Sequence, residues 1–582
     1  MYENIFTQNF LGNFFFSLFF LIVNVFFSLK VSNHKNIQKI FFFNEFQPIV
    51  VFFLTFCLYT FIFNLVILFN YKIISEVFLF LFFIQLIFII NNFISKKNFI
   101  KNKINYNINE KIIFLIFLGL YLISILPLSD ADSISIYQYL PTNIFFNGLN
   151  EINLYQNLEF TLLSNTEILL LISPILKSDN FGSQLNLIVL LFFIFTNFKN
   201  HKNFALIILS SPLIIYFISA QKLQLFFSIL FLLSFIIINN NLLKKKGEFF
   251  VFILLLVFYS SAKISYVLFT IPLFIYFFYK NLNEWKYIIL SSLISFLIIY
   301  LPLFILKQNF FGNIIAPFLD NIFGQSSESF NAFVYSIRSS EGWISDPTNF
   351  SLYLRPFISF NLSTLSSSLG LIFLIMLINY KLQKKTKFLP LILIILVLAT
   401  GQILPRYYFE AFLLLAYFYH PQKILIKLFI YSQVSVIFLI SLTYIYFAYV
   451  KYDVYKDKSK YMNKFSYSYF NSQQYKNDKI KGNVLDFSLD RHSIFLDKNV
   501  YSVRYLNILN NFNYKMDQNL KRFIERNSIN YLVSNSSDLL PGCLITEEIG
   551  ETYRKTAVRN FLLKPVKNKY KILEIKDNKC NN

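Results

Sequence analysis

The segment PLSDADSISIYQYLPTNIFFNG, residues 127–148, carries two carboxylates directly after a long apolar run, Asp130 and Asp132. Carboxylates at this spacing could accept the proton of an attacking hydroxyl group or bind a divalent cation. Such triplets also occur by chance, and an exposed loop or a helix N-cap ahead of Ser133 would explain the pair without any chemistry. The pair by itself is therefore only a candidate site.

Three isolated cations, Lys222, Lys263 and Arg406, each stand at the end of an apolar run, away from the basic clusters of the chain. Single cations at helix ends often extend toward lipid headgroups, which is the simplest explanation. Arginine also offers phosphate a planar pair of hydrogen-bond donors, and lysine offers it a point charge. If all three lie on the side of the acidic segment, they favour a site for an anionic headgroup.

The elements that must position these residues are apolar helices. Of the 582 residues, 56% are hydrophobic and only 14% are charged, whereas soluble domains carry roughly 25% charged residues. Runs such as FFIQLIFIINNFI are too long and too uniform for amphipathic surface helices. The composition indicates a polytopic membrane protein, and it excludes a cytosolic enzyme, a collagen, a coiled coil and a disordered tail.

The fold class that we predict is an all-α polytopic membrane protein with a small C-terminal α/β domain. A spanning length of roughly 16–20 residues predicts about fourteen transmembrane helices. These are residues 14–29, 49–69, 73–94, 112–128, 181–198, 204–219, 223–238, 249–262, 264–279, 287–306, 365–380, 388–403, 407–419 and 424–450.

Basic clusters between these runs orient the chain. The lysines within residues 96–103, 244–246 and 381–387 mark cytoplasmic loops by the positive-inside rule, which explains much of the net charge of +22 without a nucleic-acid partner. The apolar stretch at residues 168–176 decides on which side of the membrane the later basic clusters lie, because one additional span would reverse their side. Were it to span, residues 244–246 would face outside, so we predict that it lies in the interface. Lys222, Lys263 and Arg406 then share the outer side with Asp130.

This topology divides the chain into three parts. Residues 1–110 form N-terminal transmembrane helices, and residues 111–450 form a core with extracytoplasmic loops at 129–180 and 307–364. Residues 451–582 are charged and form a soluble extracytoplasmic domain, which begins near Tyr467 after a polar linker. Within it, NVLDFSL, SIFL and INYLVSN predict short strands, and NLKRFIERN predicts a helix.

The order of these features resembles the GT-C superfamily of integral-membrane glycosyltransferases, particularly its protein-mannosyltransferase and aminoarabinose-transferase branch. The matching residues are Asp130-Ala131-Asp132-Ser133, with Tyr137 and Gly148 behind them. The chain is more closely similar to bacterial multi-pass proteins that carry a DADS loop followed by a tyrosine. Further matching segments are SSPLIIYFISAQKLQL, FGNIIAPFL, STLSSSLG and GQILPRYYFE, so the resemblance covers about residues 111–410. Two features depart from the family: additional spans precede the acidic loop, and the two acids are not adjacent.

The resemblance implies transfer of a sugar from a polyprenyl-phosphate donor to a glycan or lipid acceptor at the outer face of the bacterial plasma membrane. Asp130 would be the base, and Asp132 would be its partner or the ligand of a divalent cation, Mg²⁺ or Mn²⁺. Glu167 would be an additional acid, although an ordinary acidic residue in the first turn of a helix explains it better. The implied substrate contacts are Lys222, Lys263, Arg406, Tyr137 and Glu167.

Two alternatives share these features: a flippase or exporter of lipid-linked saccharides, and a polymerase or ligase of such saccharides. A carrier should hold charges deep in its spans or show internal repeats, whereas the predicted spans are nearly free of charge. The four histidines lack ligand spacing, and no Walker A or G-x-G-x-x-G string occurs. The sequence therefore predicts neither a zinc site nor ATP-driven transport.

Overall fold

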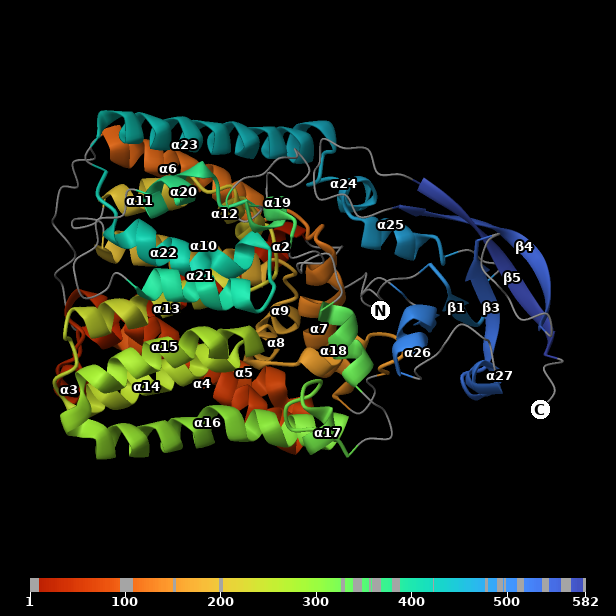
Figure 1. Cartoon of the computed structure of the whole chain (residues 1–582), viewed down its shortest axis with the longest axis horizontal. Helices are drawn as coiled ribbons and strands as arrows, with labels where there is room; N and C mark the ends of the chain where they lie inside the picture. The colour runs from red at the N-terminus through yellow and green to blue at the C-terminus, as the bar shows by residue number, and fades with distance from the viewer. Residues whose placement is uncertain are drawn as a thin grey trace.

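A computed structural model of the chain consists of a helical bundle with a small sheet domain at one end (Figure 1). It describes residues 10–94, 108–149, 153–197, 202–325, 330–338, 348–354, 357, 368–378, 388–421, 423–476, 480–488, 496, 499–509, 518–535, 544–555 and 567–578. The predicted basic loops at 96–103 and 381–387, and most of the STLSSSLG segment, lie outside these residues.

Four helical stretches are long and apolar enough to cross a membrane, as far as the described part of the chain goes: Phe15–Ser32, Asn44–Asn91, Leu282–Phe311 and Ile424–Lys451. A helix suits this role because it pairs its backbone groups internally, where lipid offers no partners. These stretches support the membrane character that the composition predicts. Their helices are α2 (Phe10–Ser32), α4 (Gln47–Asn70), α5 (Ile74–Ile94), α16 (Trp285–Phe311) and α23 (Ile424–Ile445).

The other predicted spans also coincide with helices, but these are shorter. A helix of 17 residues such as α10 extends only about 25 Å, less than a hydrocarbon core of about 30 Å. The count of about fourteen spans therefore stays a prediction. These helices are α6 (Ile108–Ser124), α10 (Phe181–Asn197), α11 (Lys202–Leu209), α12 (Leu213–Ile218), α13 (Gln224–Asn239), α14 (Lys246–Ser261), α15 (Ile264–Lys280), α20 (Leu371–Ile378), α21 (Leu389–Ala399) and α22 (Phe409–Phe418).

The apolar stretch at 168–176 does not form one long helix. It is divided between two short buried helices, α8 (Asn165–Leu169) and α9 (Ile172–Ile175). Neither is long enough to cross a membrane, because each residue of a helix advances the chain by only about 1.5 Å. This geometry agrees with the prediction that the stretch does not span.

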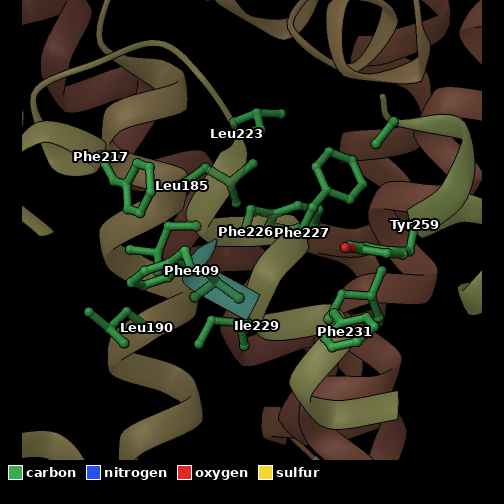
Figure 2. Packing of buried hydrophobic residues seen from close by; sticks show 14 of the residues in the cluster. Leu185, Leu190, Phe217, Leu223, Phe226, Phe227, Ile229, Phe231, Tyr259 and Phe409 are labelled. Atoms are coloured by element: carbon green, nitrogen blue, oxygen red, sulfur yellow. The ribbon is translucent and has the colours of Figure 1, made fainter. Parts of the chain in front are cut away.

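Helix α13 lies at the centre of the bundle. Every residue from Gln224 to Ile238 is buried, which is why the sequence of this helix is apolar on all faces. Figure 2 shows its phenylalanines packed among residues of neighbouring helices. The ring of Phe227 lies 5.3 Å from that of Phe258, and the ring of Phe231 lies 5.3 Å from that of Tyr259. This packing holds the N-terminal end of α13, which follows Lys222 directly.

The C-terminal domain contains a five-stranded sheet in the order β2-β1-β3-β5-β4. The predicted strands NVLDFSL and INYLVSN correspond to β1 and β3, and the predicted helix corresponds to α27 (Gln518–Arg526), whereas only Leu496 of SIFL is described. Strands β1, β2 and β3 are parallel, and β5 pairs antiparallel with β3 and β4. The strands are β1 (Asn483–Asp486), β2 (Val500–Ser502), β3 (Ile529–Ser534), β4 (Leu544–Lys555) and β5 (Lys567–Asn578).

The segment before Tyr467, which we predicted to be a polar linker, contains helix α24 (Lys458–Phe465). Asp457 caps this helix by accepting hydrogen bonds from two backbone N–H groups. Lys458 Nζ lies 2.5 Å from Asp179 Oδ2, so the helix is attached to the loop at 129–180. The same loop contacts the sheet domain, since the ring of Tyr155 lies 4.9 Å from that of Phe523. The linker is therefore part of a docked junction.

The acidic loop and the basic cluster 244–246 lie at opposite ends of the bundle. The acidic loop and the C-terminal domain share one end, and α3 (Lys35–Ile40) lies at the other (Figure 1). Lys245 Nζ donates a hydrogen bond to the carbonyl of Gln38 in α3, and Lys280 Nζ donates one to the carbonyl of Ile238. The described basic cluster 244–246 is thus at the end opposite to Asp130.

Candidate functional site

The acidic loop is fixed by its own short helical turn. The π-helical turn Ser133–Tyr137 follows the two carboxylates. Asp130 Oδ2 accepts hydrogen bonds from the backbone N–H and the hydroxyl of Ser133, both at 3.0 Å. Asp130 therefore has the purely structural capping role, whereas Asp132 accepts no capping hydrogen bond and its carboxylate contacts cations instead.

Lys222 lies between the two carboxylates. Its Nζ is 2.5 Å from Asp132 Oδ2 and 3.4 Å from Asp130 Oδ2, and it donates to the hydroxyl of Tyr216. Burial by itself would lower the pKa of Lys222, but the two aspartates outweigh it and hold the pKa above its usual value. Gln221 positions this lysine, because its backbone N–H donates to Ser133 Oγ at 3.0 Å.

Arg406 joins the same cluster from a 3-10 turn, Pro405–Tyr408, which precedes α22. Its Nη1 lies 3.6 Å from Asp132 Oδ2 and donates to the Tyr216 hydroxyl at 3.1 Å. Its backbone carbonyl accepts a hydrogen bond of 2.7 Å from Gln224 at the start of α13. The buried Nε has no hydrogen-bond partner among the described residues. Other protein atoms cover this Nε, so the part of Arg406 that lines the cavity is elsewhere on the side chain.

Lys263 and Tyr407 form a second contact beside Arg406. Lys263 precedes α15, and its Nζ donates to the hydroxyl of Tyr407 at 3.2 Å and lies 4.4 Å from the ring centre. Burial alone would raise the pKa of Tyr407, but Lys263 and Arg406 favour the phenolate and lower the pKa to about 7. The two cations therefore favour ionisation of this tyrosine.

The three cations line a cavity of about 290 Å³. Lys222, Lys263, Arg406 and Tyr137 line one part of it, and apolar side chains of α15 and α16 line much of the rest. Asp130 and Asp132 are not in the lining, so the carboxylates contact the cavity wall through Lys222 and Arg406. The cations that the sequence singled out are brought together, with the aspartates behind them.

Glu167 lines another part of the cavity, together with Lys307. Its Oε2 accepts hydrogen bonds from the backbone N–H and the hydroxyl of Ser164, so it completes the capping box of α8 as an ordinary first-turn acid would. Burial raises the pKa of Glu167 to about 7, although the bonds from Ser164 and the charge of Lys307 act in the opposite direction.

Sequence reasoning did not identify Tyr216, Tyr407 or Lys307 as individual site residues. Tyr216 and Tyr407 lie within the segments SSPLIIYFISAQKLQL and GQILPRYYFE, but no spacing distinguished them from the many other tyrosines of the chain. Lys307 follows a predicted span and has the same local signature as a residue that extends toward headgroups. Only their position in the fold separates them from other residues of their type.

The arrangement does not fit the divalent cation that we considered for Asp132. Mg²⁺ requires several oxygen ligands in near-octahedral geometry, and no group of three potential ligand residues occurs in the described part of the chain. The ammonium of Lys222 occupies the position between Asp130 and Asp132 that a shared metal ion would take. A metal role for Asp132 has no support in this geometry.

Comparison with known proteins gives no further guide. No protein family, no curated protein and no solved structure matches this chain.

Proposed function

We propose that this protein is a membrane glycosyltransferase, which moves a sugar from a polyprenyl-phosphate donor to a glycan or lipid acceptor at the outer face of the bacterial plasma membrane. One observation carries the proposal. Lys222, Lys263 and Arg406 are far apart in the sequence, yet they line one part of one cavity, and Asp132 contacts two of them. Snorkelling to headgroups would not require this convergence.

The cations suit the leaving group of such a reaction. When the bond between C1 of the sugar and the phosphate oxygen breaks, the phosphate leaves with the electron pair and must be stabilised. Arg406, Lys222 and Lys263 all line the cavity and bring positive charge there. Fixed donors in a site with little water stabilise this charge more strongly than solvent would.

The geometry favours Asp132 over Asp130 as the base, which reverses our sequence-based assignment. Asp130 Oδ2 accepts two hydrogen bonds from Ser133, whereas Asp132 Oδ2 contacts the side-chain cations Lys222 and Arg406. The exposed fractions of the two carboxylates, 26% and 25%, do not distinguish them. A donor phosphate would compete for Lys222 and Arg406. Asp132 could then accept the proton of the acceptor hydroxyl as that oxygen attacks C1.

The proposal places the prenyl chain between α15 and α16. Helix α14 packs on both of them, while α15 and α16 make little contact with each other. The cavity wall includes Ile264 and Val267 of α15 and Tyr300 and Phe304 of α16. Ile264 is half exposed on the outer face of the bundle. An apolar opening there suits a lipid tail that enters from the bilayer.

The orientation is part of the proposal. The end with Asp130, Lys222 and the C-terminal domain would face outside, and the end with Lys245 would face the cytoplasm, as the positive-inside rule requires. Alkaline-phosphatase fusions that end near Lys245 should be inactive, and fusions after Val450 should be active. An active fusion at Lys245 would contradict the topology and the position of the site.

The function is tested with the full chain in liposomes that contain a short-chain prenyl phosphate carrying a labelled sugar. We expect release of prenyl phosphate and transfer of label to an acceptor fraction from bacterial membranes. Lys222→Met should lower the rate about 100-fold or more, because it removes a cation from the leaving-group site. Lys280→Met, at the other end of the bundle, is the matched control. Movement of intact donor across the bilayer without bond cleavage would instead favour the flippase.

A further inference from the structure

The cavity lining includes two further charged residues besides the phosphate-binding cations. These are Glu167 and Lys307, with exposed fractions of only 5% and 9%. Glu167 Oε2 accepts hydrogen bonds from the backbone N–H and the hydroxyl of Ser164, and the carboxylate also accepts one from its own backbone N–H. The carboxylate is therefore buried and anchored at the start of α8, and its residue lines the cavity.

Lys307 is anchored in a comparable way on α16. Its Nζ donates to the carbonyls of Thr161 and Ala316, at 3.2 and 2.6 Å. An ammonium group has three donors, so these two bonds leave one donor unused. Lys307 and Glu167 are close enough to influence each other's charge, but they do not approach within the 4.0 Å of an ion pair. Two opposite charges thus face one cavity without direct contact.

Both groups can form hydrogen bonds beyond those to the protein, and each further bond stabilises a buried charge. A group that both donates and accepts hydrogen bonds would satisfy Glu167 and Lys307 together. Neighbouring hydroxyl groups of a sugar have this character: one can donate to the Glu167 carboxylate while the other accepts from the Lys307 ammonium. A cavity of about 290 Å³ is at the lower end of small-molecule sites, which favours one sugar over an oligosaccharide.

We propose that Glu167 and Lys307 bind hydroxyl groups of the donor's single sugar, while Lys222, Lys263 and Arg406 bind its phosphate. This inference rests on the proposed function, and it assigns sugar specificity to residues other than the phosphate contacts. Glu167 and Lys307 bind and orient the sugar, and the proton transfer stays with the aspartates.

The chain offers matched controls for a purely structural role of each residue. Glu248 is buried at the start of α14 and accepts hydrogen bonds from the backbone N–H groups of Lys244 and Lys245, much as Glu167 caps α8. Lys280 donates to the backbone carbonyl of Ile238 and to the side-chain amide oxygen of Asn241, so, like Lys307, it makes two hydrogen bonds to neutral oxygens. Both controls lie at the opposite end of the bundle.

The test measures how tightly the purified full chain binds phosphate diesters that carry a prenyl chain and a neutral sugar. The probes are a short-chain prenyl phosphate esterified with glucose, mannose, galactose or arabinose, and the same prenyl phosphate esterified with methanol, which has equal charge and no sugar. We expect wild type to bind at least one sugar diester about tenfold more tightly than the methyl diester, since hydrogen bonds to charged groups are strong. E167Q and K307M should each remove most of this preference and leave methyl-diester binding within about twofold.

The controls E248Q and K280M should keep the full sugar preference. Variants E167Q and K307M that also keep it would overturn the inference, and so would a wild type that binds the methyl diester but prefers no sugar. Because the two residues lie on different helices, K307M decides the question even where E167Q lowers stability. A wild type that binds neither diester would overturn the proposed function itself.

Discussion

Two clusters in this molecule combine an aspartate, a cation and a tyrosine, and they differ in what they leave unsatisfied. In the C-terminal domain, Asp486 at the end of β1 is fully buried; its Oδ1 accepts two bonds of 2.6 Å from Ser488, and its Oδ2 lies 2.9 Å from Arg554 Nη2. Tyr475 donates to the same carboxylate, and its ring lies 4.7 Å from the guanidinium. Every group in this cluster has a protein partner.

The cluster at the end of the bundle is assembled from the same residue types but opens onto a cavity. Asp132 keeps partial exposure, Arg406 has an unpartnered Nε, and Lys222 forms part of the cavity wall. A saturated buried ion pair joins elements, here β1 to β4, whereas a cluster of cations beside a cavity can receive a ligand. Residue composition does not separate the two cases, but contact with the cavity does.

The largest effect that we expect distinguishes the aspartates of the two clusters, Asp132 beside the cavity and Asp486 in the C-terminal domain. Asp132→Asn should lower sugar transfer about 10²–10⁴-fold, as expected for loss of a general base, with little change in thermal stability. Asp130→Asn should also be severe, since Asp130 orients the loop. Asp486→Asn should instead cost roughly 3–5 kcal/mol in the stability of the C-terminal domain, because it leaves Arg554 buried without its partner.

Transfer rates and thermal unfolding of the same preparations check this prediction. If both Asp130→Asn and Asp132→Asn keep full transfer activity, this loop is not the catalytic one. If Asp486→Asn leaves the domain as stable as before, the sealed cluster is not the structural contact that its geometry indicates.

A smaller effect should separate the two arginines. Arg406→Lys should lower turnover about tenfold or more, corresponding to about 1.4 kcal/mol of transition-state stabilisation, because lysine lacks the paired donors of a guanidinium. Arg554→Lys should lower stability and leave the affinity for prenyl phosphate unchanged. Turnover and prenyl-phosphate binding are measured side by side. Wild-type turnover in Arg406→Lys would show that Arg406 does not stabilise the leaving phosphate and only contacts lipid headgroups.

The smallest effect concerns pH. Because the pKa of Tyr407 is lowered to about 7, this side chain becomes a phenolate as the pH rises through 7. Prenyl phosphate has completed its second ionisation, near pH 6, by then. Its affinity should therefore fall a few-fold between pH 7 and 9, as a negative charge develops beside Lys263 and Arg406.

In Tyr407→Phe the affinity for prenyl phosphate should be nearly independent of pH over this range. Isothermal titration at several pH values compares the two proteins. An equal decline in both would show that another group is responsible.

Much of the architecture could be predicted from the sequence because its signals are local. Apolar runs identified α4, α5 and α16, and short hydrophobic strings identified β1 and β3. Strands β4 and β5 were missed because their sequences, LITEEIGETYRK and KNKYKILEIKDN, are rich in charge. Their pairing includes cross-strand ion pairs such as Lys571 with Glu548, which only the register of the hairpin brings together.

The sequence by itself determined the helices, the acidic loop and the isolated cations at helix ends, because hydrophobic periodicity and unpaired charge are properties of neighbouring residues. The tertiary structure alone decided that Lys222 lies between Asp130 and Asp132, and that Lys307 faces the same cavity as Glu167. The reason is physical: side chains separated by many residues meet only where packing around a buried element such as α13 fixes their backbones.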